Sequence, residues 1–559
     1  MHELKISTNW ENHTWSIKLP HQTVKLDVYY EKRPVNCHTS ISTIVESLEA
    51  ICSPTDSSDS SEYSGDDEEG FLLLMDDDAV EPKFDIDGFA VGDQIETTHL
   101  PSRAALIAFD DIHQSKEVHD RLGNLPSTIL DNPHLTNRQK EEVINLLIKY
   151  SDVFGTGYKH LKKTDLVEFH VDTGNARPVY QKPFSKFSYS ELDTLKAELN
   201  EMVDHGVLVP HTYDQTAGNG WSFPCRYVTK KDGGKRLVTQ FMKLNDVTVR
   251  DPWPIPSLKD TIEEIGSSNW LSNVDMLKGF NAIGVASDSV NKLTLSTPFG
   301  AFSYKALPFG VVNGPSAYAR LMFLAIQPFM DRNKYPDPFL IHFFDDCSLF
   351  TDTFEGHLEK MEVVLARFRD VKLTLNANKC NLFQHEIDLL SFNISKEGIK
   401  PLTEKVKKII DFPQPLNQTG VRAFVNLCGF YRNHINCFTE IVEPLLKLLK
   451  KDSMFSWTGE CEHAFKQLKS AIVDAATLSF PDREKPFFLF CDASNIGIGS
   501  TLSQMNDKGE FVPLFFYSRK LQAAEINYPT VEKELLCVVN SVAKFRKYLT
   551  KFSPITMVP

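Results

Sequence analysis

Two stretches of the sequence bring carboxylates to the end of an apolar run. The segment PDPFLIHFFDDCSLF, residues 336–350, reaches Asp345 and Asp346 and then becomes apolar again, which predicts a hairpin with two acids at its tip. Adjacent acids usually lie on a solvated turn, but Asp275 also follows an apolar strand, at Val274. Carboxylates from separate strand ends can hold two Mg²⁺ ions about 4 Å apart, which activate a hydroxyl and steady a phosphoryl displacement. Whether these acids converge depends on the fold.

Two other patterns argue against particular kinds of site, namely an aspartic-protease site and a cysteine-based zinc or redox site. The string Asp172, Thr173, Gly174 is the aspartic-protease signature, but the polar Asn175 and then Pro178 follow it where an apolar loop is needed. Ten cysteines are scattered without a CxxC pair, so zinc knuckles and thioredoxin-type redox motifs are unsupported.

A chain of 559 residues is too long for a single hydrophobic core of ordinary size. We therefore expect the helices and strands that position the acids to form several folded units. The net charge of -14 lies at one end: residues 1–150 hold 28 Asp and Glu against 12 Lys and Arg, and the remainder is close to neutral. We read the acidic part as a solvated tail or spacer. Helices are predicted after a cap at Thr136 and on the spacing of Leu192, Leu195, Leu199 and Met202 up to Gly206.

Several motifs occur in an order that resembles the reverse transcriptases of gypsy-class long-terminal-repeat retrotransposons. The palm-like strings are VDMLKGF (274–280), LPFGVVNGPSAYAR (307–320) and FFDD (343–346). WSFPCRYVTKKDGGKR (221–236) resembles that family's fingers, and FTEIVEPLLKLLKK (438–451), CDASNIGIGSTLSQ (491–504) and NYPTVEKELLCVV (527–539) resemble its thumb and ribonuclease H regions. The resemblance covers roughly 135–555 and implies a Pol polyprotein region.

The resemblance implies a metal-binding triad of Asp275, Asp345 and Asp346, with Asp275 and Asp345 as the principal ligands of Mg²⁺ and Mn²⁺ as the second candidate ion. Lys379 matches the position proposed to protonate the leaving pyrophosphate. The alternative for Lys379 is a surface lysine before a buried Cys380.

The resemblance also implies a pocket for the deoxynucleoside triphosphate. Lys231 and Arg236 match the basic pair on the triphosphate, although a KKDGGK turn by itself would be an exposed hairpin. Phe280 matches the aromatic residue that excludes a ribose 2′-hydroxyl, with a core phenylalanine as the alternative. The remaining matches are Phe309, Gly310 and Pro315, on the segment that faces nucleotide and template.

Asp492 and Glu534 match two acids of the ribonuclease H two-metal site. No Asp follows Asp507, and the other acids of that site are not found, so we expect a vestigial site that holds metal poorly and does not hydrolyse an RNA:DNA hybrid.

The predicted fold is α+β: a right-hand polymerase with fingers, palm and thumb, followed by a truncated ribonuclease H-like α/β domain. The predicted boundaries are an acidic, partly disordered region at 1–130, fingers and palm at 131–400, thumb or connection helices at 401–455, and the ribonuclease H-like domain at 456–559.

The leading hypothesis is RNA-directed DNA polymerisation on an RNA or DNA template-primer with deoxynucleoside triphosphates, with other Pol or Gag products as further partners. An intracellular location, cytoplasmic or nuclear, is expected because no signal peptide or membrane span is visible. The alternative is a catalytically silent retroelement remnant that binds nucleic acid or a host partner. Departures from the family pattern favour the remnant, namely Gln240, Met242, Leu277 and Ser391.

Overall fold

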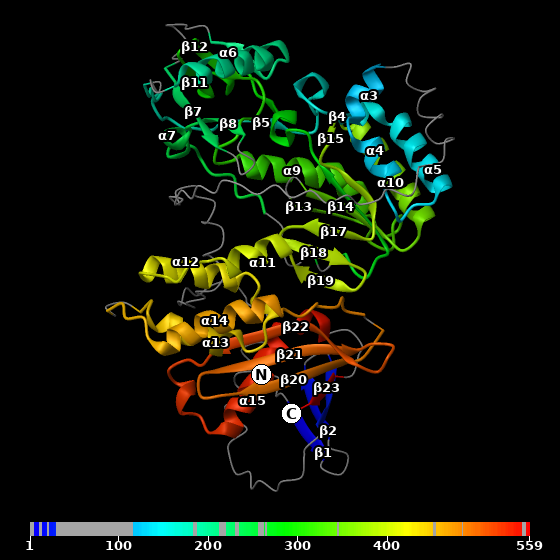
Figure 1. Ribbon diagram of the computed structural model, residues 1–559, viewed down its shortest axis with the longest axis vertical. Helices are drawn as coiled ribbons and strands as arrows, with labels where there is room; N and C mark the ends of the chain where they lie inside the picture. Colours follow the sequence, from blue (N-terminus) through cyan, green and yellow to red (C-terminus); the bar gives the residue numbers. More distant parts are fainter. Residues whose placement is uncertain are drawn as a thin grey trace, which may run out of the picture. The chain divides into compact units, whose positions relative to one another are not determined.

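The computed structural model divides the chain into two compact units, Met1–Leu100 and Pro101–Pro559 (Figure 1). It describes side chains for residues 116–182, 187–211, 220–229, 234–254, 262, 265–343, 346–450, 454–482 and 484–549, and the backbone alone for 5–9, 14–19, 22–28 and 555–558. Most of the acidic region predicted at 1–130 lies outside these residues. Its described part in the first unit is an antiparallel meander of β1 (Lys5–Asn9), β2 (Thr14–Leu19) and β3 (Gln22–Val28).

The described part of the second unit begins with a helical base, which includes the end of the acidic region predicted at 1–130. The helix predicted after Thr136 is confirmed, with a full capping box between Thr136 and Gln139. Residues 116–130 form two helices that pack against this base. The elements are α3 (Lys116–Leu122), α4 (Leu125–Leu130), α5 (Asn137–Lys149), η2 (Ser151–Val153), β4 (Phe154–Gly155) and η3 (Tyr158–His160).

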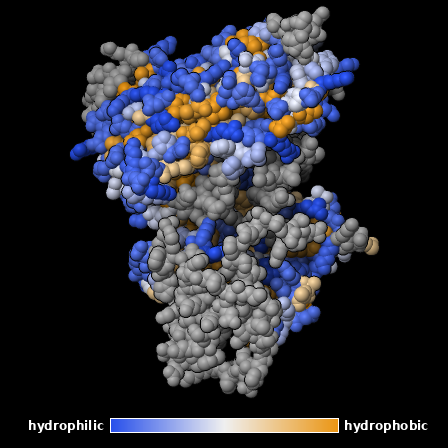
Figure 2. All heavy atoms as spheres, turned by 180° about the vertical axis from the view of Figure 1, so that it is seen from behind, coloured by the Kyte–Doolittle hydropathy of each residue, from blue (hydrophilic) through white to orange (hydrophobic). Residues whose placement is uncertain are grey.

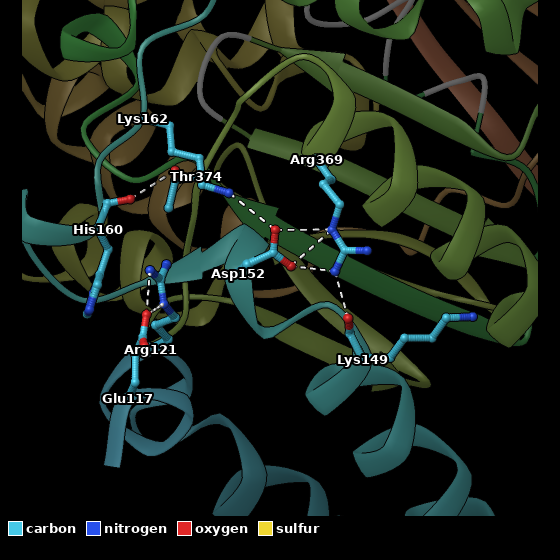
Figure 3. Close-up of polar contacts among 8 residues, drawn as sticks. All are labelled: Glu117, Arg121, Lys149, Asp152, His160, Lys162, Arg369 and Thr374. Atoms are coloured by element: carbon cyan, nitrogen blue, oxygen red, sulfur yellow. Dashed lines mark hydrogen bonds and ion pairs between the residues drawn. The ribbon is translucent and has the colours of Figure 1, made fainter. Parts of the chain in front are cut away.

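Asp152 fastens this base to α10 (Phe354–Asp370). Its carboxylate accepts hydrogen bonds from Arg369 Nε at 3.0 Å and from Lys162 Nζ at 3.3 Å (Figure 3). Arg369 also donates to the carbonyl of Lys149 at the end of α5. Because one carboxylate meets two cations from different segments, the base and α10 are held in one arrangement.

A five-stranded sheet in the order β6-β12-β11-β7-β8 forms the next layer, with α6 beside it (Figure 1). The helix predicted up to Gly206 is confirmed as α6, since Ser188 caps it and Gly206 follows its end with φ of 68°. The elements are β5 (Glu168–Phe169), α6 (Tyr189–Asp204), β6 (Leu208–Pro210), β7 (Phe223–Thr229), β8 (Lys235–Thr239), α7 (Met242–Asn245), β10 (Gly284–Val285), η5 (Val290–Lys292), β11 (Thr294–Thr297) and β12 (Gly300–Tyr304).

A four-stranded sheet in the order β13-β14-β9-β16 carries Asp275 and Asp346. It shares one hydrophobic core with α9 and α10, and β13 and β14 form the predicted hairpin. The elements are β9 (Trp270–Asp275), η4 (Gly279–Ala282), α9 (Gly314–Ile326), η6 (Gln327–Met330), β13 (Leu340–Phe343), β14 (Asp346–Thr351), β15 (Leu375–Asn376) and β16 (Asn381–Gln384).

A buried histidine ties α10 to this sheet. The N–H of Phe383 donates to Ser272 Oγ at 2.8 Å, and Ser272 Oγ lies 2.7 Å from His357 Nε2. Thr351 Oγ1 lies 2.9 Å from His357 Nδ1 and donates to the carbonyl of Thr353. Because the Thr351 hydroxyl donates its only proton to Thr353, it accepts from the N–H at Nδ1, and the neutral ring accepts the Ser272 hydroxyl proton at Nε2. Burial favours this neutral imidazole over the charged form.

Acid is expected to destabilise the second unit as the pH falls from 6.5 towards about 4. Burial lowers the pKa of His342 and His434 to about 4 and that of His357 to about 3, from an ordinary value of 6.5. Each therefore takes up a proton on unfolding, so its contribution is complete above pH 6.5 and is lost below it, by up to about 1.4 kcal/mol per pH unit. Denaturant unfolding followed by circular dichroism at pH 7.5 to 4.5 measures this slope.

The matched variants for this experiment are His357→Gln and His205→Gln. His357→Gln should have a shallower pH slope than wild type, because glutamine does not titrate. His205 is exposed, so its variant should keep the wild-type slope. Equal slopes for wild type and His357→Gln would contradict the assignment of a neutral buried imidazole.

A small meander and four helices follow, and they share a second hydrophobic core. They are joined to β22 (Phe511–Lys520) of the last sheet, since Arg432 Nη2 donates to the carbonyl of Ser518 at 2.8 Å and Lys520 Nζ donates to Glu443 Oε1 at 3.1 Å. The elements are β17 (Glu386–Leu389), β18 (Phe392–Ser395), β19 (Gly398–Pro401), α11 (Thr403–Ile410), α12 (Gln418–Gly429), η7 (Arg432–His434), α13 (Phe438–Lys447) and α14 (Gly459–Val473).

The last region of the second unit is an α/β layer. Three antiparallel strands run in the order β20-β21-β22, β23 pairs with β20 in parallel, and α15 packs on β20 and β21 (Figure 1). The elements are β20 (Phe487–Ala493), β21 (Gly497–Met505), β22 (Phe511–Lys520), η8 (Glu525–Asn527), α15 (Thr530–Lys544), α16 (Arg546–Leu549) and β23 (Ile555–Val558).

The described surface is mostly hydrophilic on the face that Figure 2 shows, with apolar patches between the polar side chains. Within the described ranges, no helix is both long enough and apolar enough to pass through a bilayer.

Candidate active site

The register between two strands brings the first and last of the three predicted acids together. Strand β9 ends at Asp275 and β14 begins at Asp346, and these residues are directly paired in the antiparallel ladder. Directly opposed residues have Cβ atoms about 5 Å apart and the side chains share one face of the sheet. The structure therefore places Asp275 and Asp346 side by side. Asp345 lies outside the described residues.

The two carboxylates influence each other electrostatically. Burial and the charge of Asp275 raise the pKa of Asp346, while a hydrogen bond from Asn273 and the charge of Lys379 act in the opposite direction. Asn273 is oriented for this because its Oδ1 accepts from Ser348 Oγ at 3.3 Å, which leaves its amide nitrogen for Asp346. Two acids held together against their repulsion indicate a place where a cation fits.

Lys379 lies at the edge of this pair. Its Nζ is 3.3 Å from Asp275 Oδ2, and its side chain is 65% exposed while that of Asp275 is 19% exposed. The expectation that Lys379 belongs to the site is therefore compatible with its position, and the ammonium group remains accessible to a ligand.

The donor set suits a hard cation. Both facing side chains are carboxylates, whose hard oxygen atoms Mg²⁺ prefers as ligands. Among the residues that the structure describes, no group of three His, Cys, Asp or Glu side chains could hold a metal ion. The third ligand that the sequence predicts is Asp345, which is not among them.

Three of the residues predicted for the nucleotide form a continuous row. The Arg236 guanidinium lies 5.6 Å from the ring centre of Phe309, and the Phe309 ring centre lies 4.8 Å from that of Phe280. These side chains come from β8, from the loop before α9 and from η4. Because a cation prefers the face of an aromatic ring, this contact directs Arg236 along the row. Lys231, the other predicted cation, lies outside the described residues.

Phe280 is supported from behind by Tyr318 of α9. Their rings are stacked with centres 5.1 Å apart and planes 7° apart. Gly279 allows this close packing, since a Cβ at that position would lie 2.6 Å from Tyr318 Oη. Tyr318 is not among the residues predicted from the sequence. Its signal was its place one helical turn after Pro315, on the buried face of α9.

Gly310 and Pro315 occupy positions that are compatible with their unusual backbone properties. Gly310 has φ of 91°, a conformation that side chains disfavour. Pro315 stands in the first turn of α9, where a missing N–H costs nothing. The turn after Gly310 is held by hydrogen bonds to Asn245, which is likewise not among the residues predicted from the sequence. Asn245 was visible only as part of the string LND.

In the last sheet, Asp492 on β20 and Glu534 on α15 also come together. The N–H of Ala493 donates to Glu534 Oε1 at 3.3 Å, and burial together with the charge of Asp492 raises the pKa of Glu534. The predicted ribonuclease H-like pair is therefore adjacent in space.

The residues that depart from the family pattern differ in their burial and backbone conformation. Leu277 is buried, and Met242 is 72% exposed. Ser391 has φ of 74° and follows Leu390 at 51°, so a backbone that favours glycine is built here from two larger residues, which costs about 1–2 kcal/mol each. Asp172 of the protease-like string is exposed and accepts from the N–H of Gly174 at 2.8 Å, as in an ordinary turn.

Comparisons with known proteins agree with this arrangement. Residues 228–394 match the family "Reverse transcriptase (RNA-dependent DNA polymerase)", and residues 457–557 match "RNase H-like domain found in reverse transcriptase". Over 423 residues the chain is 30% identical to the retrovirus-related Pol polyprotein from transposon 297 of Drosophila melanogaster, which covers 74% of this chain and 38% of the relative. It is 26% identical over 385 residues to the transposon Tf2-3 polyprotein of Schizosaccharomyces pombe, covering 68% of this chain and 28% of the relative.

Solved structures show the same fold. The foamy viral protease-reverse transcriptase in complex with dsDNA has a TM-score of 0.69 at 20% identity, covering 78% of this chain and 88% of that one. Its dRH form in complex with double-stranded DNA has a TM-score of 0.67 at 19% identity, covering 84% of this chain and 76% of that one. The predicted right-hand polymerase fold with a ribonuclease H-like domain is therefore confirmed.

The chain spans well under half the length of these Pol relatives. Within that span, it is related to the Pol polyproteins of retrotransposons and carries a reverse transcriptase domain followed by an RNase H-like domain.

Proposed function

We propose that this chain is an RNA-directed DNA polymerase whose active site is built on Asp275, Asp345 and Asp346. The observation that carries the proposal is the pairing of Asp275 with Asp346 across β9 and β14. This pairing sets two carboxylates on one face of a sheet, and the row of Arg236, Phe309 and Phe280 ends at Phe280, five residues after Asp275 in the chain.

The three acids would hold Mg²⁺, or Mn²⁺ in its place. When bound, the metal lowers the pKa of the primer 3′-hydroxyl and neutralises charge that develops on the phosphate. The pairing of Asp275 and Asp346 sets the acids in place before substrate arrives, so little reorganisation is needed. Asn273 orients Asp346 through the hydrogen bond that opposes the rise in its pKa.

The incoming deoxynucleoside triphosphate would lie along the aromatic row. Arg236 binds its phosphates, Phe280 meets the sugar, and Lys231 is the second phosphate contact. Lys379 donates a proton to the leaving pyrophosphate, for which its exposed ammonium group beside Asp275 is suitably placed.

An RNA or DNA template-primer is the proposed polymeric substrate. The related fold of the foamy viral protein has been solved with an RNA/DNA hybrid and with dsDNA, which supports this substrate class. Exposed basic side chains lie on the two helices after the small meander: Lys407, Lys408 and Arg422. Basic side chains that contact phosphates release bound counterions, so binding of the template-primer should weaken steeply as the salt concentration rises.

Primer extension on poly(rA)/oligo(dT) with Mg²⁺ tests the proposal. The wild-type chain should add deoxythymidylate, and Asp345→Asn should reduce incorporation by about 10³-fold or more, because a metal ligand is lost. Equal incorporation at background by wild type and Asp345→Asn would contradict the proposal and favour a silent remnant. The positive φ of Ser391 and the burial of Leu277, two departures from the family pattern, are the structural reason to keep the silent remnant as the second candidate function.

A further inference from the structure

Two asparagine side chains bind two distant segments to each other in a reciprocal way. Asn245 Nδ2 donates to the carbonyl of Gly310 at 2.9 Å, and Asn245 Oδ1 accepts from the N–H of Val312 at 2.9 Å. In return, Asn313 Nδ2 donates to the carbonyl of Val249 at 2.7 Å, and its Oδ1 accepts from the N–H of Asp251 at 3.0 Å. Segments 245–251 and 310–313 are therefore joined by four hydrogen bonds from two amides.

Of the two asparagines, Asn245 binds the segment next to the proposed nucleotide pocket. Gly310 follows Phe309 and has φ of 91°, so the chain turns sharply between Phe309 and α9. Phe309 is 41% exposed and its ring contacts Arg236 on one side and Phe280 on the other. Its position is therefore determined largely by how the turn at 310–312 is held.

A side-chain amide is well suited to hold such a turn. It donates and accepts at the same time, whereas an ionised carboxylate of the same shape only accepts and an apolar side chain does neither. Asn245 uses both functions on two backbone groups that are two residues apart. This fixes the turn more tightly than either hydrogen bond by itself.

We propose that Asn245 is a positioning residue for the nucleotide pocket, which holds the turn at 310–312 so that Phe309 closes the row between Arg236 and Phe280. The inference rests on the proposed polymerase function. It predicts that loss of the Asn245 amide weakens deoxynucleotide binding without a matching loss in the rate of the bound complex.

Asn245→Ala and Asn245→Asp test this, with Asn132→Ala as the matched control. Asn132 makes the same kind of pair, donating to the carbonyl of Phe383 at 2.8 Å and accepting from the N–H of His134 at 2.9 Å, but it lies in the helical base. Asn245→Ala should raise the KM for deoxynucleotide about 10-fold, while kcat stays within about threefold. Asn245→Asp keeps the acceptor for Val312 and should fall between wild type and Asn245→Ala.

The control separates positioning from stability. Asn132 is 3% exposed, so Asn132→Ala should lower the melting temperature at least as much as Asn245→Ala and leave the KM within about twofold of wild type. Equal KM values for the two alanine variants, or a loss in kcat alone, would overturn the inference.

Two further measurements do not depend on turnover. On a primer ended with a dideoxynucleotide, the next deoxynucleotide should stabilise the complex at about 10-fold higher concentration for Asn245→Ala than for wild type. Hydrogen exchange followed by mass spectrometry should be faster around Val312 in Asn245→Ala and unchanged there in Asn132→Ala. Unchanged exchange would overturn the inference.

Failure of the proposed function has a different signature, namely a wild-type chain that extends no primer. Faster exchange at Val312 together with weaker binding of deoxynucleotide to the dideoxy-ended complex would still support the role of Asn245 in that case.

Discussion

Replacing Asp275 by asparagine should lower deoxynucleotide incorporation by about 10³-fold or more, which corresponds to about 4 kcal/mol of transition-state stabilisation. Asparagine keeps the size of the side chain and removes the charge that would bind a cation. The same change should leave the melting temperature at or above the wild-type value. The reason is that Asp275 faces Asp346 across the strand pair, and its charge raises the pKa of Asp346.

The loss of the ion pair with Lys379 does not offset this relief. Lys379 is 65% exposed, and exposed ion pairs contribute only about 0–1 kcal/mol. Primer extension and differential scanning fluorimetry on the same samples measure the two effects. Asp337 is exposed and lies outside the strand pair, so Asp337→Asn should change neither quantity. Incorporation above about a tenth of wild type in Asp275→Asn, or a clearly lower melting temperature, would contradict this account.

Phe280→Val should raise the kcat/KM for ribonucleotides about 10²-fold while that for deoxynucleotides changes much less. The Phe280 ring is held between Phe309 and Tyr318, so it cannot swing aside to admit a 2′-hydroxyl. Valine removes the outer part of the ring and opens that space. Steady-state incorporation of matched ribo- and deoxynucleotides opposite one template base measures the ratio.

The alternative reading of Phe280 as a core residue predicts a different result. Phe302 is also partly buried against the same core, so Phe302→Val serves as the control for lost packing. Both variants should be less stable, but only Phe280→Val should change sugar discrimination. Phe280→Tyr keeps the ring and should keep the wild-type ratio. An unchanged ratio in an active Phe280→Val enzyme would assign Phe280 to the core alone.

Local signals in the sequence were sufficient for much of the fold. The cap at Thr136 and the end of α6 at Gly206 were found because capping depends on residues within one turn of each other. The hairpin of β13 and β14 followed from two apolar runs around a polar tip. The helices at 116–130 have a weaker local signal, since α3 has seven residues of which only Leu122 is buried.

By itself, the sequence determined which side chains are available for chemistry and in what order they occur, because residue type and spacing are local properties. It also indicated the resemblance to reverse transcriptases, through motifs that are each contiguous in the chain. Only the tertiary structure decided which of these residues meet. Asp275 faces Asp346 because of a strand register, Tyr318 supports Phe280 because α9 packs on η4, and Asn245 reaches Gly310 across 65 residues of chain. Such contacts depend on how separate elements pack, which no single stretch of sequence encodes.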